Sequence, residues 1–277
     1  MTTTKPTTAS NTPLVLKIGG NEIDDPAFLA RLVAYVSALD RPVVIVHGGG
    51  KEIGRLQAAM GIEAQWVDGL RVTDQATLAV VEMVLCGSVN KRLVRALLAG
   101  GIDAVGLSGT DRGLIRATRL HHPGGDLGRV GEVTDVRAEV LTALLAQGVT
   151  PVVAPLALGD DGEPFNVNAD HAAAALAVAL NADRIVFLTN VQAVLVQDQP
   201  QAALSTHQAL ALIADGTITG GMIPKVKTAL HAVQLGIPQA VITDLTGLQT
   251  GGGTMFHAGA PAAYSPPSEV VAQYAAR

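Results

Sequence analysis

The chain has 277 residues, of which 48% are apolar and 16% are charged. This length suits one large domain or a two-lobed one, and the composition excludes a wholly disordered chain. A formal net charge of −5 argues against non-specific nucleic-acid binding, which requires a basic surface. The single cysteine, Cys86, excludes an intrachain disulfide framework and a cysteine-rich metal site. No apolar run approaches the roughly 20 residues of a membrane-spanning helix, so we expect no membrane association.

Short β-branched runs alternate with longer segments rich in Ala and Leu. In the first half we expect, in chain order, a strand at 14–18, a helix at 26–39, a strand at 42–46, a helix at 51–60, a short hairpin at 63–72, helices at 74–86 and 89–98, and a strand at 102–107. In the second half we expect turns and hairpins over 108–135, a helix at 136–147, a strand at 149–154, a helix at 169–180, a strand at 184–188, helices at 207–214 and 224–235, and a strand at 239–243.

This alternation predicts an α/β fold in which a mainly parallel open sheet lies between two layers of helices, a three-layer αβα sandwich. We expect a single domain over residues 14–256. The Thr-rich, polar residues 1–13 lack the apolar core of a secretory signal. We therefore expect a disordered N-terminal segment in a cytoplasmic protein. Residues 257–277 form a Pro- and Ala-rich tail without an assigned function.

Two glycine runs follow predicted strands and precede helices: Gly19-Gly20 and Gly48-Gly49-Gly50. Ligands of open parallel sheets bind beyond the carboxyl ends of the strands, and glycines there let backbone N–H groups approach an anion. Neither run continues into G-x-G-x-x-G or a P-loop, which argues against a dinucleotide dehydrogenase and a P-loop enzyme. Any nucleotide site must therefore be built in another way.

Three charged residues occupy positions in the sequence that call for a structural or functional explanation. Lys17 lies inside an apolar strand, where an ammonium group is costly unless it meets a ligand, a partner or solvent. Lys225 lies where the glycine-rich turn Gly220-Gly221 meets a helix start, and a cation there opposes the helix dipole. Asp170 precedes an almost wholly apolar helix, where it could cap the helix, serve a function, or do both.

Eight motifs occur in order over residues 14–256: LVLKIGG, IVHGGG, DGLRVTD, VNKRLV, VGLSGTD, FNVNAD, LTNV and GGMIPK. Together they resemble the amino-acid kinase family, and within it the enzymes that phosphorylate N-acetylglutamate in arginine biosynthesis. The ordered set is far more specific than either glycine run. The resemblance implies an N-terminal lobe, about 14–180, for acceptor binding and dimerisation, and a C-terminal lobe, about 181–256, for the nucleotide.

The implied reaction transfers the γ-phosphoryl group of ATP to the side-chain carboxylate of N-acetyl-L-glutamate, giving an acyl phosphate. A carboxylate is already ionised at neutral pH, so no general base is needed. The remaining difficulty is that an anion must approach a polyanion, so catalysis rests on positioning and electrostatic stabilisation. Mg²⁺ is expected to be held mainly by phosphate oxygens and water, and no protein ligand for it is predicted.

The resemblance also implies a role for individual residues. Lys17 and Lys225 match the two lysines on the transferring phosphoryl group and the leaving phosphate, and Asp170 matches the carboxylate that holds both ammonium groups. The expected phosphate-binding backbone N–H groups belong to Gly19, Gly20 and Gly49. The expected acceptor-binding residues are Gly49, Gly50, Arg71 and Asn166. The expected nucleotide-binding residues are Asn190, Val191, Leu195, Thr217, Ile218 and Thr219.

Two departures from the family pattern bear on these expectations. Asn190 stands where members commonly carry Asp, which puts one nucleotide contact in doubt. Arginine-inhibited members have a longer N-terminal helix that links dimers into a ring, whereas only about 13 polar residues precede the first predicted strand here. We expect a homodimer that is insensitive to arginine. Two alternatives remain open: a kinase for carrier-protein-bound aminoadipate or glutamate in lysine biosynthesis, and a non-catalytic nucleotide-binding regulator.

Overall fold

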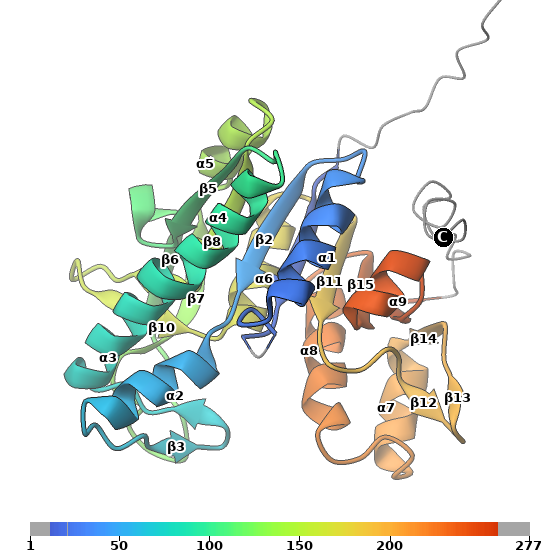
Figure 1. Ribbon diagram of the computed structural model, residues 1–277. Coiled ribbons are helices and arrows are strands. Elements are labelled where there is room, and N and C mark those ends of the chain that lie inside the picture. Colours follow the sequence, from blue (N-terminus) through green and yellow to red (C-terminus); the bar gives the residue numbers. More distant parts are fainter. Residues whose placement is uncertain (1–11, 21, 260–277) are drawn as a thin grey trace, which may run out of the picture.

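The computed structural model describes residues 12–20 and 22–259. An eight-stranded sheet with the order β14-β16-β15-β11-β1-β2-β8-β5 forms its centre (Figure 1). Its strands are β1 (Leu14–Ile18), β2 (Val43–His47), β5 (Ala104–Ser108), β8 (Thr150–Ala154), β11 (Arg184–Leu188), β14 (Ala203–Ser205), β15 (Gln239–Thr243) and β16 (Thr254–His257). Neighbouring strands are parallel except for β15 and β16, which pair antiparallel.

Helices cover both faces of this sheet. On one face lie α1 (Pro26–Ser37), α4 (Asn90–Ala99) and α9 (Leu245–Thr250), and on the other lie α5 (Ala138–Leu145), α6 (Ala169–Ala179) and α8 (Met222–Gln234). Each face has its own core of buried aliphatic side chains. The predicted three-layer αβα sandwich is therefore confirmed. Within the described residues, no helix is both long and apolar enough to cross a membrane.

Local sequence signals explain where several helices begin. Asp25 caps α1 by accepting a hydrogen bond from the backbone N–H of Ala27 at 2.9 Å, and Pro26 occupies the first turn. Asp74 caps α3 (Gln75–Glu82) in the same way, accepting from Thr77 at 2.7 Å. The remaining α-helices of the described residues are α2 (Gly50–Ala59) and α7 (Thr206–Ala214). The predicted helices therefore begin within a few residues of the observed ones.

The helical segment after Asp74 differs from the prediction. We expected two helices separated near Gly87, but α3 continues through a π-helical segment, η1 (Met83–Val89), directly into α4. Its wider turns keep the backbone groups around Gly87 hydrogen-bonded, so the glycine does not end the helix. The predicted break is therefore wrong. As a result, Leu85 and Val89 lie in one continuous helical segment.

A second, closed sheet with the order β10-β7-β6-β9 was expected only in part, as turns and hairpins over 108–135. Its strands are β6 (Ile115–Arg119), β7 (Val130–Val136), β9 (Leu156–Leu158) and β10 (Pro164–Val167). β9 and β10 were not predicted, because strands of three or four residues are too short to show an alternating pattern. β10 runs directly into α6 and so brings Asn166 toward Asp170. Two ribbons complete the fold: β3 (Trp66–Val67) with β4 (Leu70–Arg71), where a hairpin was predicted, and β12 (Leu195–Val196) with β13 (Gln199–Pro200).

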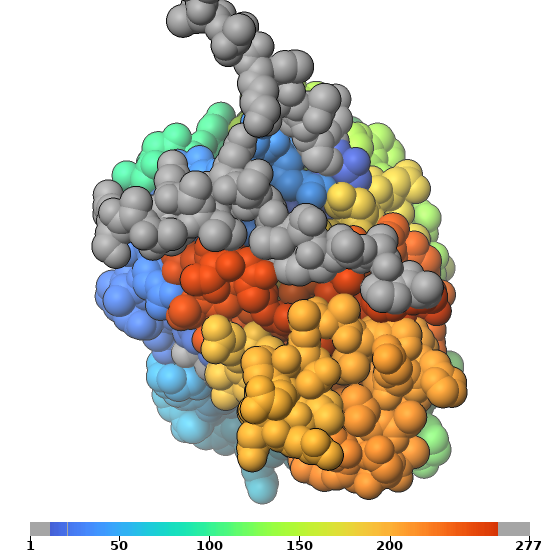
Figure 2. Space-filling view, turned by 90° about the vertical axis from the view of Figure 1, so that its right-hand side faces the viewer, coloured from blue at the N-terminus to red at the C-terminus, as the bar shows by residue number. Residues whose placement is uncertain are grey.

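The central sheet joins strands from the two halves of the chain at β1. β2, β8 and β5 lie on one side of β1, and β11, β15, β16 and β14 lie on the other. Figure 2 shows the face made by the later part of the chain, where segments coloured orange to red lie together. The last strand ends at His257, and most of the predicted N-terminal segment and tail lie outside the described residues.

Candidate active site

Lys17 and Asp170 form an ion pair at the centre of the molecule. Side chains alternate along β1, so Lys17 lies on the same face as Val15, the face that α6 covers. Asp170 lies in the first turn of α6, where the side chain of Asn168 already caps the helix by accepting from the Asp170 N–H at 2.8 Å. The Asp170 carboxylate is therefore free to meet the lysine, and the Nζ–Oδ1 distance is 2.7 Å.

This ion pair opens into a cavity of about 240 Å³ at the carboxyl ends of β1 and β11. The cavity is lined by Lys17, Gly19, Glu22, Asp170, Phe187, Leu188, Thr189, Asn190, Lys225 and Thr228. The fold thus brings together the three charged residues that the sequence singled out. It adds Glu22, Thr189 and Thr228, which sequence reasoning missed. Thr228 carried a usable signal, because a residue three positions after Lys225 lies on the same helix face.

Lys225 lies in the first turn of α8 and also lines this cavity. Its Nζ donates to the Gly221 carbonyl at 3.3 Å. No carboxylate lies within ion-pair distance of it in the part of the chain that the structure describes. Asp170 therefore contacts Lys17 and not Lys225, whereas the resemblance implied contact with both. Lys225 remains a positive charge available to an anion in the cavity.

The two glycine runs pack against each other, which explains why side chains are excluded there. A Cβ atom on Gly20 would lie 2.7 Å from the Gly49 nitrogen. A Cβ atom on Gly49 would lie 2.6 Å from the Leu85 side chain on η1. Gly48 donates its N–H to the Ile18 carbonyl at 3.0 Å, which ties the second run to the end of β1. The close approach places backbone donors from both runs at one edge of the sheet.

A second cavity, of about 180 Å³, borders the first, because Ala169 lines one and Asp170 lines the other. It is lined by Gly48, Gly49, Gly50, Ile53, Trp66, Gly69, Leu70, Arg71, Leu85, Val130, Pro155, Asn166, Val167, Asn168 and Ala169. The residues that the resemblance implied for acceptor binding all lie here. The site therefore consists of two adjoining chambers: the first cavity, which we call the lysine chamber, and the second, which we call the Arg71 chamber.

Arg71 is a buried cation, with an exposed fraction of 8%. Its guanidinium lies 4.3 Å from the centre of the Trp66 ring and donates to the side chain of Gln57 and, at 3.1 Å, to the Gly50 carbonyl. Burial lowers the pKa of Arg71. No carboxylate pairs with it among the residues that the structure describes. A buried cation without a counter-ion is costly, so an anionic ligand in this chamber would stabilise it.

Asn166 lies beside Arg71 in the same chamber. Its Nδ2 donates to Thr73 Oγ1 at 3.1 Å, and Thr73 Oγ1 donates to the Arg71 carbonyl at 2.9 Å. These two hydrogen bonds connect β10 of the closed sheet to β4 of the ribbon. The amide and the guanidinium are therefore held on one wall.

The residues expected to contact a nucleotide are more scattered. Asn190 lines the lysine chamber directly after β11, and Val191 follows it with its N–H donating to Thr189 Oγ1 at 3.2 Å. Leu195 lies on β12 with an exposed side chain. The Ile218 side chain is packed in the core with an exposed fraction of 2%, so only its backbone could meet a ligand.

Thr217 and Thr219 lie in the connection between α7 and α8, and both are exposed. The Thr217 N–H donates to Asp215 Oδ1 at 2.9 Å. Neither threonine lines the lysine chamber. Of the expected nucleotide residues, only Asn190 lies in the wall of the lysine chamber; Leu195, Thr217 and Thr219 are exposed outside it, and Val191 and Ile218 pack against or within the core.

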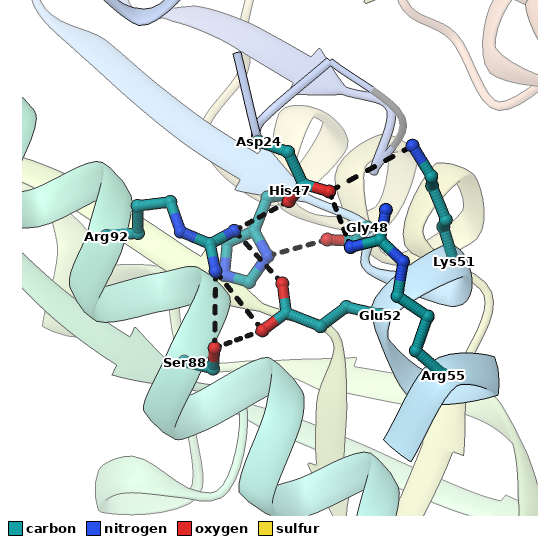
Figure 3. Close-up of polar contacts among 8 residues, drawn as sticks. All are labelled: Asp24, His47, Gly48, Lys51, Glu52, Arg55, Ser88 and Arg92. Atoms are coloured by element: carbon teal, nitrogen blue, oxygen red, sulfur yellow. Dashed lines mark hydrogen bonds and ion pairs between the residues drawn. The ribbon is translucent and has the colours of Figure 1, made fainter. Parts of the chain in front are cut away.

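A charged cluster holds the loop after Gly20 in place (Figure 3). Asp24 Oδ1 accepts from Arg92 at 2.9 Å, and Asp24 Oδ2 accepts from Arg55 at 3.0 Å and lies 4.0 Å from Lys51 Nζ. Arg92 also donates to both oxygens of Glu52, at 3.0 and 3.2 Å, and this hydrogen bonding raises the pKa of the arginine. The cluster ties the loop to α2 and α4. It therefore supports the close approach of the two glycine runs.

Known proteins that are similar to this chain add to what the geometry of the site indicates. The family model described as amino acid kinase family matches residues 12–244. A protein named acetylglutamate kinase from Roseiflexus castenholzii is 56% identical over 236 residues, which cover 85% of this chain and 90% of the relative. A protein of the same name from Chloroflexus aurantiacus is 48% identical over 244 residues, covering 88% of this chain and 96% of the relative.

Solved structures show the same architecture. The Streptococcus mutans protein smu.665 is 30% identical with a TM-score of 0.75, covering 89% of this chain and 99% of that one. Carbamate kinase from Giardia lamblia bound to AMP-PNP has a TM-score of 0.65 at 18% identity, covering 91% of this chain and 100% of that one, a likeness of fold alone.

Proposed function

This chain belongs to the amino acid kinase family, and from that premise we propose that it transfers the γ-phosphoryl group of ATP to the side-chain carboxylate of N-acetyl-L-glutamate. The observation that carries the proposal is the adjoining pair of chambers. One holds two lysines, of which Lys17 is paired with Asp170, together with the carboxylate of Glu22, and the other holds a buried guanidinium without a counter-ion among the described residues. The names of the relatives at 48–56% identity support the same acceptor.

The lysine chamber suits a reaction limited by charge repulsion. The acceptor carboxylate is ionised at neutral pH and needs no base. Lys17 and Lys225 would neutralise the transferring phosphoryl group and the leaving phosphate, which is the main requirement of phosphoryl transfer. Asp170 would act through Lys17 by fixing its ammonium group at 2.7 Å. Gly19, Gly20 and Gly49 would add backbone N–H donors.

The Arg71 chamber would bind the acceptor. A planar guanidinium suits bidentate capture of the α-carboxylate, and that anion would stabilise the buried charge. Asn166 and the backbone of Gly49 and Gly50 would bind the remaining polar groups. The side-chain carboxylate would then face the border at Ala169 and Asp170, where the two chambers meet.

ATP would enter the lysine chamber with its base toward the C-terminal half, near Asn190, Val191 and Leu195 and the connection formed by Thr217, Ile218 and Thr219. Mg²⁺ would arrive bound to ATP and be held mainly by phosphate oxygens and water. Within the described residues, no group of three His, Cys, Asp or Glu side chains is placed to hold a metal ion. The two lysines of the lysine chamber suit the phosphate oxygens that would carry the metal.

The acceptor is tested by measuring ADP release with Mg-ATP and each of four acceptors. We expect turnover with free N-acetyl-L-glutamate and far less with N-acetyl-L-aspartate or L-glutamate, because the first is too short to span the two chambers and the second lacks the acetyl group. Activity only on a carrier-protein-bound aminoadipate would replace this proposal with the carrier-dependent kinase. ATP binding without turnover on any acceptor would favour the non-catalytic regulator.

We also propose that two copies of the chain pair through the helices between residues 51 and 98. Met83 on η1 and Leu98 on α4 are apolar and each exposes 50% of its surface, which supports burial against a partner. A two-fold dimer is the commonest closed assembly. Light scattering at the dimer mass supports this pairing, and a monomer at micromolar concentration contradicts it.

A further inference from the structure

His47 and Asn90 form a buried polar pair that the reaction outlined above does not use. His47 is the last residue of β2, and Asn90 is the first residue of α4; both are fully buried. His47 Nδ1 lies 3.0 Å from the Gly48 carbonyl oxygen (Figure 3). His47 Nε2 lies 3.1 Å from Asn90 Nδ2. The pair therefore connects α4 to the start of the second glycine run.

The surroundings determine which nitrogen of the imidazole carries its proton. Asn90 Nδ2 donates to the carbonyls of Val152 at 2.9 Å and Leu107 at 3.3 Å, and Asn90 Oδ1 accepts from Lys91 Nζ at 3.1 Å, which fixes the amide orientation. Because Asn90 Nδ2 only donates, His47 Nε2 must accept. Because the Gly48 carbonyl only accepts, His47 Nδ1 must carry the hydrogen. Burial lowers the pKa of His47 to about 4, so the ring is neutral at physiological pH.

Fixing the Gly48 carbonyl also fixes the N–H group of Gly49. No peptide bond is cis in the described chain, and in a trans peptide the C=O and N–H groups point in opposite directions. The Gly49 N–H therefore points away from the His47 ring. Its nitrogen faces Gly20, where a Cβ atom would lie 2.7 Å away, and Gly49 lines the Arg71 chamber. No hydrogen bond from this N–H to a described residue is present.

We propose that His47 and Asn90 are positioning residues that aim the Gly49 N–H at the phosphoryl group during transfer. Asn90 holds His47 as the Nδ1–H tautomer, His47 holds the Gly48 carbonyl, and the shared peptide plane directs the Gly49 donor. The inference rests on the proposed function for the identity of the anion. The hydrogen-bonded pair itself is independent of it.

Two substitutions of His47 separate positioning from simple filling of space. The amide nitrogen of Asn occupies the place of imidazole Nδ1, whereas that of Gln occupies the place of Nε2. We expect His47→Gln to lower kcat on the order of a hundredfold, the usual effect of losing one preorganised donor. We expect His47→Asn to retain most of kcat, and the acceptor KM to change little in both variants. Equal loss in the two variants, or a normal kcat in His47→Gln, overturns the proposal.

The matched control is His257→Gln, which alters another buried histidine, at the end of β16. It should lower the unfolding temperature without changing kcat. A readout that needs no turnover is the nitrogen-15 NMR spectrum of the wild-type protein. We expect His47 to show protonated Nδ1, and the Gly49 amide signal to shift on addition of Mg-ATP, with no such shift in His47→Gln.

The NMR experiment keeps the two claims apart. A wild-type protein that releases no ADP with N-acetyl-L-glutamate but shows the Nδ1–H tautomer and the Gly49 shift contradicts the proposed function alone. Active wild-type protein with a proton on Nε2, or with a Gly49 amide that does not respond to Mg-ATP, contradicts the positioning role alone.

Discussion

The Nζ atom of Lys17 lies 2.7 Å from Oδ1 of Asp170, although one residue comes from the first strand and the other from a helix in the middle of the chain. The contact exists because β1 turns Lys17 toward α6 and because Asn168, not Asp170, caps that helix. The lysine keeps an exposed fraction of 15% and the carboxylate 26%, both facing the lysine chamber. The ion pair therefore fixes the Lys17 ammonium group close to the border between the two chambers.

Lys17→Ala and Lys225→Ala should each lower kcat by about a hundredfold or more, with a smaller change in the acceptor KM, because both lysines line the chamber proposed for the phosphates and not the Arg71 chamber. Steady-state kinetics with N-acetyl-L-glutamate measures both constants. Lys227→Ala is the control, since Lys227 lies exposed on the same helix as Lys225. A large rise in KM with near-normal kcat would show that the lysines bind the acceptor instead.

Arg71→Lys should act mainly on the acceptor. A lysine keeps the charge but loses the planar fork and the stacking on Trp66, so we expect the acceptor KM to rise at least about tenfold, the equivalent of one charge-assisted hydrogen bond. The KM for ATP should change little. Arg119→Lys, on the exposed end of β6, serves as the control. An unchanged acceptor KM contradicts the assignment of Arg71.

Gly49→Ala should abolish activity and lower the unfolding temperature, because the new methyl group would lie 2.6 Å from Leu85. Shifting the second glycine run to relieve this clash would misplace its N–H donors. The double variant Gly49→Ala/Leu85→Ala removes the opposing atoms and should recover part of the thermal stability. Gly87→Ala is the control, since its Cβ would meet nothing within 4 Å. Wild-type stability in the single variant would show that Gly49 is not in close contact with Leu85.

Stability should fall as the pH falls from about 6.5 to about 4, in part because of His47. Its pKa is about 4 in the folded protein and 6.5 in the unfolded chain, so the unfolded state binds more protons in this window. At 1.36 kcal/mol per pKa unit, the full pKa difference corresponds to a loss of about 3 kcal/mol in the free energy of unfolding at the acidic end of this pH window. Urea unfolding of the wild type and of His47→Asn at pH 7 and pH 4.5 measures this contribution. An equal loss in both proteins contradicts the buried, neutral state of His47.

Much of the central fold could be predicted from particular residues. Asp25-Pro26 marks the start of α1, and the continuous apolar run before His47 marks a buried parallel strand. A lysine inside the strand Leu14–Ile18 indicated a ligand-facing charge, and the structure places it in a cavity. These signals are local, so they can be read without knowing which segments meet.

Other features depend on contacts between distant segments. That Asp170 reaches Lys17 and not Lys225 depends on how α6 and α8 lie against β1, which no spacing encodes. The burial of the Ile218 side chain follows from packing within the core on this face of the sheet, so the sequence could not show that only its backbone is left for a nucleotide. The π-helical segment around Gly87 packs Leu85 against Gly49, a residue of a distant loop, and this contact has no local signal in the sequence.

The central claim is that this site joins a phosphoryl group to the side-chain carboxylate of free N-acetyl-L-glutamate. Hydroxylamine converts an acyl phosphate into a stable hydroxamate, so trapping it during turnover detects the product itself. With Mg-ATP and N-acetyl-L-glutamate, we predict one hydroxamate for each ADP released, and neither product when the acceptor is omitted. Release of ADP at the same rate with and without the acceptor, and no hydroxamate in either case, would contradict the account.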